Sequence, residues 1–168
     1  ISASLVGSEM CIRDSGYPVV KESVLVTADF GLPQRRSRLY LVCFREDCAY
    51  IADSFRFPSG MAFRTPTASK FLKRGLAKKL INTIRCGGRG SKDHHAWDQI
   101  PRQRGGWYKL SVRDCLRLMG FPEDFHMPVP PTHQFRLLGN AVTREPAAAI
   151  LQECKRILRE LFRQRLLS

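Results

Sequence analysis

Two short segments near the start of the chain have the composition of β-strands. Residues 17–28 (YPVVKESVLVTA) are rich in β-branched side chains, and residues 39–44 (LYLVCF) form a continuous apolar run. A run of this length with polar residues at both ends predicts a strand that is buried on both faces. Between the segments, Gly31 and Pro33 interrupt any regular element. The pattern therefore predicts two strands separated by a loop.

The middle of the chain predicts one short helix followed by loops. Residues 67–81 carry apolar side chains on one side of a helix, and Pro66 suits its first turn; the apolar residues are Ala68, Phe71, Leu72, Leu76 and Leu80. The stretch that follows contains Gly87, Gly88, Gly90, Pro101, Gly105 and Gly106. This frequency of glycine predicts a loop-rich region.

The last third predicts two helices joined by an extended linker. Ser111 and Asp114 have the spacing of a capping box, and Gly120 followed by Pro122 ends the helix that they begin. Prolines 128, 130 and 131 indicate the linker. A final helix is expected over residues 145–166, about 30 Å long. Its apolar stripe is Ile150, Leu151, Cys154, Leu158, Leu161 and Phe162, and its polar side is Lys155, Arg156, Arg159 and Arg163.

The composition is that of a folded protein, but the charge is unusual. The 168 residues are 43% hydrophobic and 26% charged, and 28 Lys and Arg against 15 Asp and Glu give a net charge of +13. This excess predicts a polyanionic partner, which is most often nucleic acid and less often an anionic membrane surface. No apolar stretch approaches the roughly 18 residues that span a bilayer, so no membrane partner is expected.

Most of the excess charge lies in residues 64–109, which contain 12 Lys or Arg and two Asp. The six cysteines are scattered and include no CxxC pair. This usage predicts a reduced, cytoplasmic compartment. Cys86, His94 and His95 match no recognised zinc spacing, so no metal is expected.

The first 15 residues (ISASLVGSEMCIRDS) have no periodic pattern and no turn residues leading into the rest. They also lack the basic start and apolar core of a signal peptide. The segment resembles a translated sequencing-linker scar, so we expect residues 1–15 to be non-native. On this interpretation an N-terminal part of the natural protein is missing.

The segment DFGLPQRRSR, residues 29–38, carries the most informative polar residues. In an extended backbone, Gln34, Arg36 and Arg38 would point the same way while the following strand enters the core. Guanidinium groups at the start of a buried strand lose hydration free energy unless an oxygen-rich ligand accepts their hydrogen bonds. From these residues alone, a solvated basic turn is the simpler alternative.

Three segments together resemble the DNA (cytosine-5)-methyltransferases. DFGLPQRRSRLYLVCF is similar to the eighth conserved block of that family, a PQ-x-R-x-R element followed by an apolar strand. YKLSVRDCLRLMGFPEDF, residues 108–125, resembles the ninth block, and HQFRLLGNAVT, residues 133–143, resembles the tenth. They occur in the family's order, with a basic variable segment between the eighth and ninth. The resemblance covers essentially residues 16–165.

The resemblance implies a mechanism. Enzymes of this family flip the target cytosine out of the duplex, because its C5 is not reachable in the stack. A cysteine attacks C6, a glutamate assists at N3, and C5 takes the methyl group of S-adenosylmethionine. Arg38 matches the arginine that donates to the flipped cytosine, and Arg36 the neighbour that helps to hold the nucleotide and the catalytic loop. Gln34 is expected to brace this cluster.

The tenth block implies a cofactor-binding role. Asn140, Ala141 and Val142 match the element that packs beside the S-adenosylmethionine pocket and supports the catalytic loop. Ala141 stands where the family usually has serine, so any contact from that hydroxyl is absent.

Other parts of the family pattern are absent from this sequence. The family's nucleophile follows a proline, and none of the six cysteines here does. Cys115 in the ninth block is expected to be a packing residue. The E-N-V element with the assisting glutamate and the F-x-G-x-G cofactor loop are also missing. In the family all of these precede the eighth block, which agrees with a truncation.

Residues 82–97 (NTIRCGGRGSKDHHAW) occupy the position of the target recognition region. Their glycines permit close approach to DNA, and their basic side chains can meet phosphates or read guanine. The expected DNA-binding residues are Arg85, Gly87, Gly88, Arg89, Ser91 and Lys92. The alternative is a basic loop that contributes only non-specific affinity.

We therefore expect an α/β chain that carries part of a methyltransferase. Residues 16–60 would supply the last strands of a partial S-adenosylmethionine-dependent methyltransferase sheet, and residues 61–110 a small basic target recognition region. Residues 111–168 would supply a recognition-region helix, a linker and a C-terminal helix that returns to the catalytic domain.

The expected function is that of a DNA (cytosine-5)-methyltransferase in a restriction-modification system of a bacterium or phage. Its expected partners are double-stranded DNA and the missing N-terminal catalytic part of the same protein, and the complete enzyme is expected to be a monomer. The alternative is a non-catalytic DNA-binding module or a split-enzyme subunit. The presence of Gln34, Arg36 and Arg38 favours the enzyme, because a pure binder has no cytosine to hold.

Overall fold

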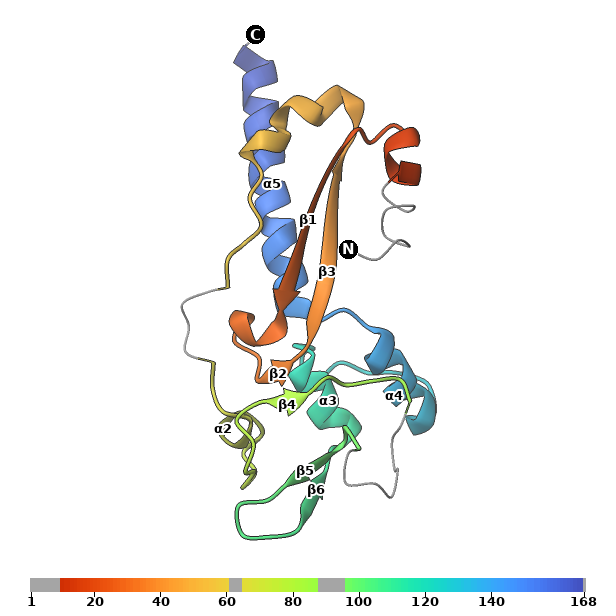
Figure 1. The fold of residues 1–168 in the computed structure, drawn as a ribbon, viewed down its shortest axis with the longest axis vertical. Helices are drawn as coiled ribbons and strands as arrows, with labels where there is room; N and C mark the ends of the chain where they lie inside the picture. The colour runs from red at the N-terminus through yellow and green to blue at the C-terminus, as the bar shows by residue number, and fades with distance from the viewer. Residues whose placement is uncertain (1–9, 61–64, 88–95, 168) are drawn as a thin grey trace. The chain divides into compact units, whose positions relative to one another are not determined.

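The computed structural model describes residues 10–60, 65–87 and 96–167, drawn in colour in Figure 1. Contacts divide the chain into two compact units. The first unit combines the residues up to 25 with residues 38–58 and the residues from 149 onward. The second unit combines residues 26–37 with residues 59–148. Each unit is therefore assembled from segments that are far apart in the sequence.

The first unit is a strand pair packed with helices. Strands β1 (Val19–Val26) and β3 (Ser37–Phe44) are hydrogen-bonded neighbours, and they run side by side in Figure 1. The 3₁₀ segment η2 (Glu46–Ser54) follows β3, and the long helix α5 (Arg144–Leu167) closes the chain. Phe44 and Phe55 meet edge to face with ring centroids 5.8 Å apart. The two predicted strands are confirmed.

The predicted burial of the second strand on both faces is wrong. Residues 39–43 of β3 are half-buried, and Phe44 is the fully buried residue of the run. The reason is that β1 is the only strand paired with β3 in the described part of the chain. On β1, Val24 is 62% exposed. The strand pair therefore keeps apolar surface that is not covered here.

Helix α5 confirms the last predicted element, but its apolar stripe differs from the expected one. Ile150, Ile157 and Leu161 are buried. Leu151, Leu158 and Phe162, which were expected in the same stripe, are 68%, 47% and 61% exposed. The difference arises because the buried residues, seven and eleven positions apart from Ile150, form a narrower face of the helix than the expected stripe. The basic side chains lie on the exposed side, as predicted.

The described residues of the second unit form two small sheets and three α-helices. Strand β2 (Gln34–Arg35) pairs in parallel with β4 (Ile81–Asn82), and β5 (Gln99–Pro101) pairs in antiparallel with β6 (Trp107–Lys109). The helices are α2 (Ala68–Leu72), α3 (Val112–Leu118) and α4 (Pro131–Asn140), and the 3₁₀ turn η1 (Thr27–Phe30) follows β1. Their common core includes Leu72, Ile81, Ile84, Trp97, Ile100, Leu110, Leu118 and Leu138.

The helix predicted over residues 67–81 is much shorter in the structure. Thr67 caps α2, and its side chain accepts from the Lys70 backbone N–H at 3.3 Å. Lys73 ends the helix in the left-handed conformation at φ 54°, where helical bonding cannot continue. Leu76 then forms a β-bridge with Arg102. Tertiary pairing therefore overrides the apolar periodicity of this segment.

The predicted helix after Ser111 is confirmed, whereas the predicted linker ends one residue too late. Helix α3 begins with the predicted capping box of Ser111 and Asp114, and Gly120 follows it at φ 80°. The linker expected through Pro131 is wrong in its last residue, because Pro131 is the first residue of α4. Proline is favoured there, since the first helical N–H has no partner within a helix.

Candidate functional site

Gln34 is fully buried and joins three segments of the second unit. Its amide Nε2 donates to the carbonyl of Leu118 at 3.0 Å, at the end of α3. Its Oε1 accepts from the backbone N–H of Ile84 at 3.3 Å. The backbone of β2 is held by its parallel pairing with β4, in which Gln34 lies opposite Ile81. The donor and the acceptor of the Gln34 amide are therefore both hydrogen-bonded to the protein backbone.

Arg36 is the central donor of the same cluster and is 1% exposed. Its Nη1 donates to the carbonyl of Ile84 at 2.7 Å. Its Nη2 donates to the carbonyls of Gly139 and Ala141 at 3.0 and 2.6 Å. The last two carbonyls belong to the C-terminal end of α4, where a positive charge is favourable. We call Gln34, Arg36 and the carbonyls that they contact the buried bracket.

Two threonines extend the buried bracket. The backbone N–H of Thr27 donates to the carbonyl of Arg36 at 2.8 Å. The Thr27 hydroxyl donates to the hydroxyl of Thr143 at 3.1 Å, and both residues are buried. The pair links the start of η1 to the segment that follows Val142. Sequence reasoning missed this pair, because a single threonine carries no signal of a partner more than 100 residues away.

Gly139 brings α4 into direct contact with the backbone that enters the expected recognition segment. A Cβ atom at this position would lie 2.1 Å from the Cys86 backbone nitrogen and 2.4 Å from the Arg85 carbonyl carbon. Only glycine fits at such a distance. The G-N-A-V element and residues 85–86 therefore pack backbone to backbone, next to the carbonyls that Arg36 contacts.

The structure separates the three residues expected on one polar face. Gln34 and Arg36 are buried, whereas Arg38 is exposed on β3. Arg38 belongs to the first unit and the other two to the second. The expected cofactor residues also differ in exposure: Asn140 and Val142 are exposed, and Ala141 is half-buried. Arg38, Asn140 and Val142 are thus the accessible members of the predicted site.

The recognition segment is described only at its edges. Arg85 and Gly87 are exposed, and the Gly87 carbonyl accepts from the indole Nε1 of Trp97 at 2.8 Å. Trp97 is buried in the core, so this contact fixes the edge of the segment. Gly88, Arg89, Ser91, Lys92, His94 and His95 lie outside the described residues.

A second polar cluster anchors the β5–β6 hairpin to helix α3. The Tyr108 hydroxyl donates to Asp114 Oδ2 at 2.8 Å, and the same oxygen accepts from the Ser111 backbone N–H at 2.9 Å. Arg74 Nε donates to the Tyr108 oxygen at 3.2 Å, and the Arg74 and Arg102 guanidinium groups lie over the Tyr108 ring. Burial raises the pKa of Tyr108, and so does its hydrogen bond to Asp114.

Three cysteines line one apolar hollow of the first unit. Cys43, Cys48 and Cys154 surround it together with Phe44, Phe55 and other apolar side chains. Burial raises the pKa of the Cys43 and Cys154 thiols. A nucleophilic cysteine needs the opposite shift, because the thiolate is the reactive form. The buried Cys115 packs in the core of the second unit.

Residues 10–60, 65–87 and 96–167 contain neither a candidate metal site nor a candidate membrane span. No group of three or more His, Cys, Asp or Glu side chains there could hold a metal ion. No helix in those ranges is both long enough and apolar enough to cross a bilayer.

The chain matches the family model described as C-5 cytosine-specific DNA methylase, over residues 11–85 and 79–156. It is 30% identical to the type II methyltransferase M.BsuFI of Bacillus subtilis, over 78% of this chain and 38% of that protein. It is 26% identical to M.MspI of Moraxella sp, over 91% of this chain and 42% of that protein. The chain thus spans about two fifths of the length of these two curated relatives.

Two solved structures share the fold. The S. pombe Dnmt2 methyltransferase superposes with a TM-score of 0.61 at 18% identity, over 95% of this chain and 63% of that one. The Entamoeba histolytica methyltransferase EhMeth gives a TM-score of 0.57 at 15% identity, over 95% and 59% of the two chains. The mixed α/β fold is therefore that of methyltransferase structures. Since the family model covers most of the sequence, the chain belongs to the C-5 cytosine-specific DNA methylase family.

Proposed function

We propose that this chain is the carboxyl-terminal part of a DNA (cytosine-5)-methyltransferase that acts on a flipped cytosine in duplex DNA. The observation that carries the proposal is the buried bracket in a member of this family. Arg36, from the PQ-x-R-x-R element, donates to the Gly139 and Ala141 carbonyls of the G-N-A-V element and to Ile84 at the edge of the recognition segment. One side chain therefore joins the three segments that the reaction requires.

The arginines have different roles in this proposal. Arg38 is exposed and would donate to the flipped cytosine, where fixed donors stabilise charge that develops on the ring. Arg36 and Gln34 are positioning residues, because their polar groups contact the protein's own backbone. They would fix the positions of the recognition segment and the tenth block and would not contact the nucleotide directly.

The methyl donor in this proposal is S-adenosylmethionine, which supplies an electrophilic methyl group when bound. Asn140, Ala141 and Val142 would line one side of its pocket. The exposed amide of Asn140 and the exposed side chain of Val142 offer a polar and an apolar contact, which fits a ligand of mixed polarity. The Ala141 carbonyl accepts from Arg36, so the backbone of this element is fixed in place.

Duplex DNA would be bound by the recognition segment. Arg85 and Gly87 are exposed at its edge, and Gly88, Arg89, Ser91 and Lys92 complete the proposed DNA-binding set. The backbone contact at Gly139 and the bond from Trp97 hold the edge of this segment. Phosphate contacts would position the duplex, and guanine contacts from arginine would select the sequence.

The partner of this chain would be the N-terminal catalytic part of the same protein. The strand pair β1–β3 keeps half-buried apolar residues, and two strands alone are marginally stable. Further strands of a methyltransferase sheet would cover them. The complete enzyme would be a cytoplasmic monomer in a bacterial or phage restriction-modification system, the setting that the type II names of its relatives suggest.

The test begins with the genomic DNA upstream of the codon for Gly16. An in-frame Pro-Cys and an E-N-V element are expected there, and their absence would favour a non-catalytic DNA-binding module. In the joined protein, Arg38→Ala should lower the turnover number by about 100-fold or more, as when one transition-state donor is removed. Its affinity for non-specific duplex should change less than about twofold.

Arg35→Ala is the matched control, because Arg35 is also exposed and lies outside the proposed site. It should leave both turnover and affinity near the parent values. Equal losses of turnover and affinity in Arg38→Ala would indicate that Arg38 binds a DNA phosphate and not the cytosine, which would contradict the proposal.

A further inference from the structure

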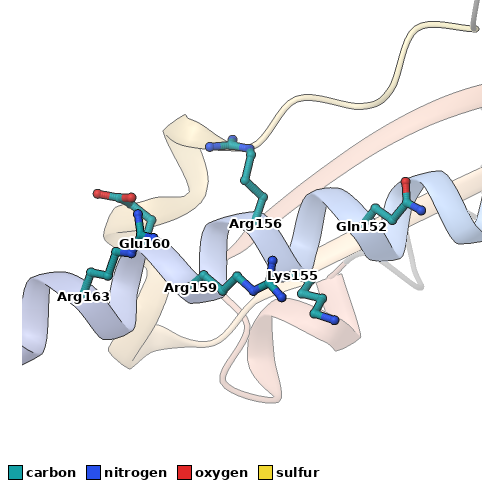
Figure 2. Close-up of a pocket in the computed structure, with 6 residues that line it drawn as sticks. All are labelled: Gln152, Lys155, Arg156, Arg159, Glu160 and Arg163. Carbon is teal, nitrogen blue, oxygen red and sulfur yellow. The ribbon is translucent and has the colours of Figure 1, made fainter.

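The exposed side of helix α5 carries a row of like charges. Lys155, Arg159 and Arg163 follow one another at intervals of four residues, and all three are exposed. Together with Gln152, Arg156 and Glu160 they line a shallow hollow of about 460 Å³ on the helix surface, shown in Figure 2. We call Lys155, Arg159 and Arg163 the basic stripe.

The three cations of the basic stripe outnumber the one carboxylate, that of Glu160, which lines the same hollow. None of its three cations is within salt-bridge distance of a carboxylate in the described part of the chain. Like charges four residues apart destabilise a helix by a few tenths of a kcal/mol per pair, about 0.2–0.5. The stripe contains two such pairs, so its like charges lower the stability of the helix.

Arg156 differs from the stripe, although it lines the same hollow. It forms two hydrogen bonds with the Glu153 carboxylate, at 2.9 and 2.7 Å, and donates to the Ser54 carbonyl at 3.0 Å. This pairing lowers the pKa of Glu153, so the carboxylate stays charged and neutralises Arg156. Arg156 therefore ties α5 to η2, and the stripe supplies the net charge of this face.

The stripe has dimensions that suit a nucleic-acid backbone. Eight residues of α-helix separate its first and last members, which corresponds to about 12 Å along the axis. Phosphates of one DNA strand rise by about 3.4 Å along the duplex axis, and the strand also winds around that axis, so a straight row of this length reaches about two or three of them. The buried residues Ile150, Ile157 and Leu161 hold the opposite side of α5 in the first unit, which leaves the stripe accessible.

We propose that the basic stripe of α5 binds the phosphate backbone of duplex DNA as a second contact surface, distinct from the recognition segment. The proposal rests on the proposed function only in taking duplex DNA as the ligand. The stripe adds affinity that does not depend on base sequence, because flexible cations meet phosphates, which are the same at every base pair.

An anionic lipid surface would meet the same charges, since Leu151, Leu158 and Phe162 are exposed on the same helix. The observations favour DNA for two reasons. The hollow is bordered by Gln152 and Glu160, which would have to be desolvated at a membrane. The chain also belongs to a family of DNA-modifying enzymes. Membrane binding is therefore an outcome of the test.

The experiment measures binding of the 168-residue chain to a short duplex of random sequence over a range of salt concentrations. The test variant combines Lys155→Gln, Arg159→Gln and Arg163→Gln. Its slope of log K against log salt should be shallower than wild type by about 2–3, because each lost phosphate contact removes about 0.9. Glu160→Gln should change affinity in the opposite direction and tighten binding.

The control variant removes the same charge elsewhere in the first unit, by Lys21→Gln, Arg45→Gln and Arg56→Gln. Lys21 and Arg45 are already paired, with Asp53 at 3.6 Å and Asp47 at 2.5 Å. The control should change the slope by less than about 1, since these cations make no phosphate contact on this proposal. Helical circular dichroism checks that each variant is folded.

Four results would overturn the inference. Equal slope changes in the test and control variants would mean that only net charge matters. Tighter binding to phosphatidylserine vesicles than to duplex, lost in the test variant, would assign the stripe to membranes. A wild-type chain that binds no duplex would contradict both the stripe and the proposed function, whereas a wild-type slope in the test variant would contradict the stripe alone.

Discussion

Arg36 shows how a basic residue near a site can act through the backbone. Its guanidinium satisfies three carbonyl oxygens in the interior, and charge-assisted bonds of this kind are stronger than neutral ones. The sequence left two alternatives for the guanidinium groups at this strand, contact with an oxygen-rich ligand or a solvated basic turn. It could not show that the partner is the protein's own backbone, because Gly139 and Ala141 approach Arg36 only in the folded chain.

Replacing Arg36 by methionine should strongly destabilise the protein. Arg36→Met keeps an unbranched apolar stem but removes the guanidinium, which leaves three carbonyls without this donor, so we expect a loss of about 2–5 kcal/mol. The measurement is the urea-unfolding midpoint. Arg38→Met is the control and should change stability by less than about 0.5 kcal/mol, because Arg38 is exposed. Equal small effects would show that the buried bracket contributes little to stability.

Substituting Gly139 should be harmful despite its helical position. Alanine normally stabilises a helix interior by about 1 kcal/mol relative to glycine. Here the added Cβ would lie 2.1 Å from the Cys86 nitrogen, so Gly139→Ala should instead cost about 1–3 kcal/mol. Gly87→Ala is the control, because nothing lies within 4 Å of a Cβ there. A raised unfolding midpoint in Gly139→Ala would refute the close packing of α4 against residues 85–86.

At the scale of elements, the sequence predicted the helices whose ends or apolar faces are specified by residues close together in the chain. Helix α3 has its capping box and α5 its long apolar periodicity, and both are present. Helix α2 ends early because Lys73 turns the chain and Leu76 pairs with Arg102. The β5–β6 hairpin has strands of three residues, too short for a periodic pattern, and its position depends on contacts of Tyr108 with Arg74 and Asp114.

The link between the hairpin and α3 should depend on pH through Tyr108. Its pKa in the folded protein is raised above the ordinary value of 10.0, so the neutral phenol is the favoured form. The stability that this form contributes is fully present below pH 10 and is lost as pH rises through the raised value. Tyr108→Phe should therefore flatten the alkaline decline of the unfolding midpoint.

At neutral pH the same variant should lower stability by about 1 kcal/mol through the lost hydrogen bond. Tyr50→Phe is the matched control, because Tyr50 is 61% exposed. It should reproduce the wild-type stability at neutral pH. If the unfolding midpoint falls as steeply with rising pH in Tyr108→Phe as in wild type, groups other than Tyr108 cause the decline.

At the scale of the whole molecule, the chain carries the supporting parts of the proposed enzyme rather than its nucleophile. None of its six cysteines follows a proline, and burial raises the thiol pKa of Cys43 and Cys154. We therefore expect the 168-residue chain alone to transfer no methyl group to duplex DNA. The measurement is incorporation of labelled methyl groups into DNA, with a complete methyltransferase as positive control. Detectable incorporation would contradict this assignment of parts.

The buried bracket also has a consequence for the order in which the protein folds. The bonds of Arg36 join residues that are 48, 103 and 105 positions apart. Contacts that close such long loops form late, because the chain loses much entropy before they are made. Arg36→Met should then accelerate unfolding and leave the refolding rate nearly unchanged. The three bonds would determine the lifetime of the folded state rather than the speed at which it forms.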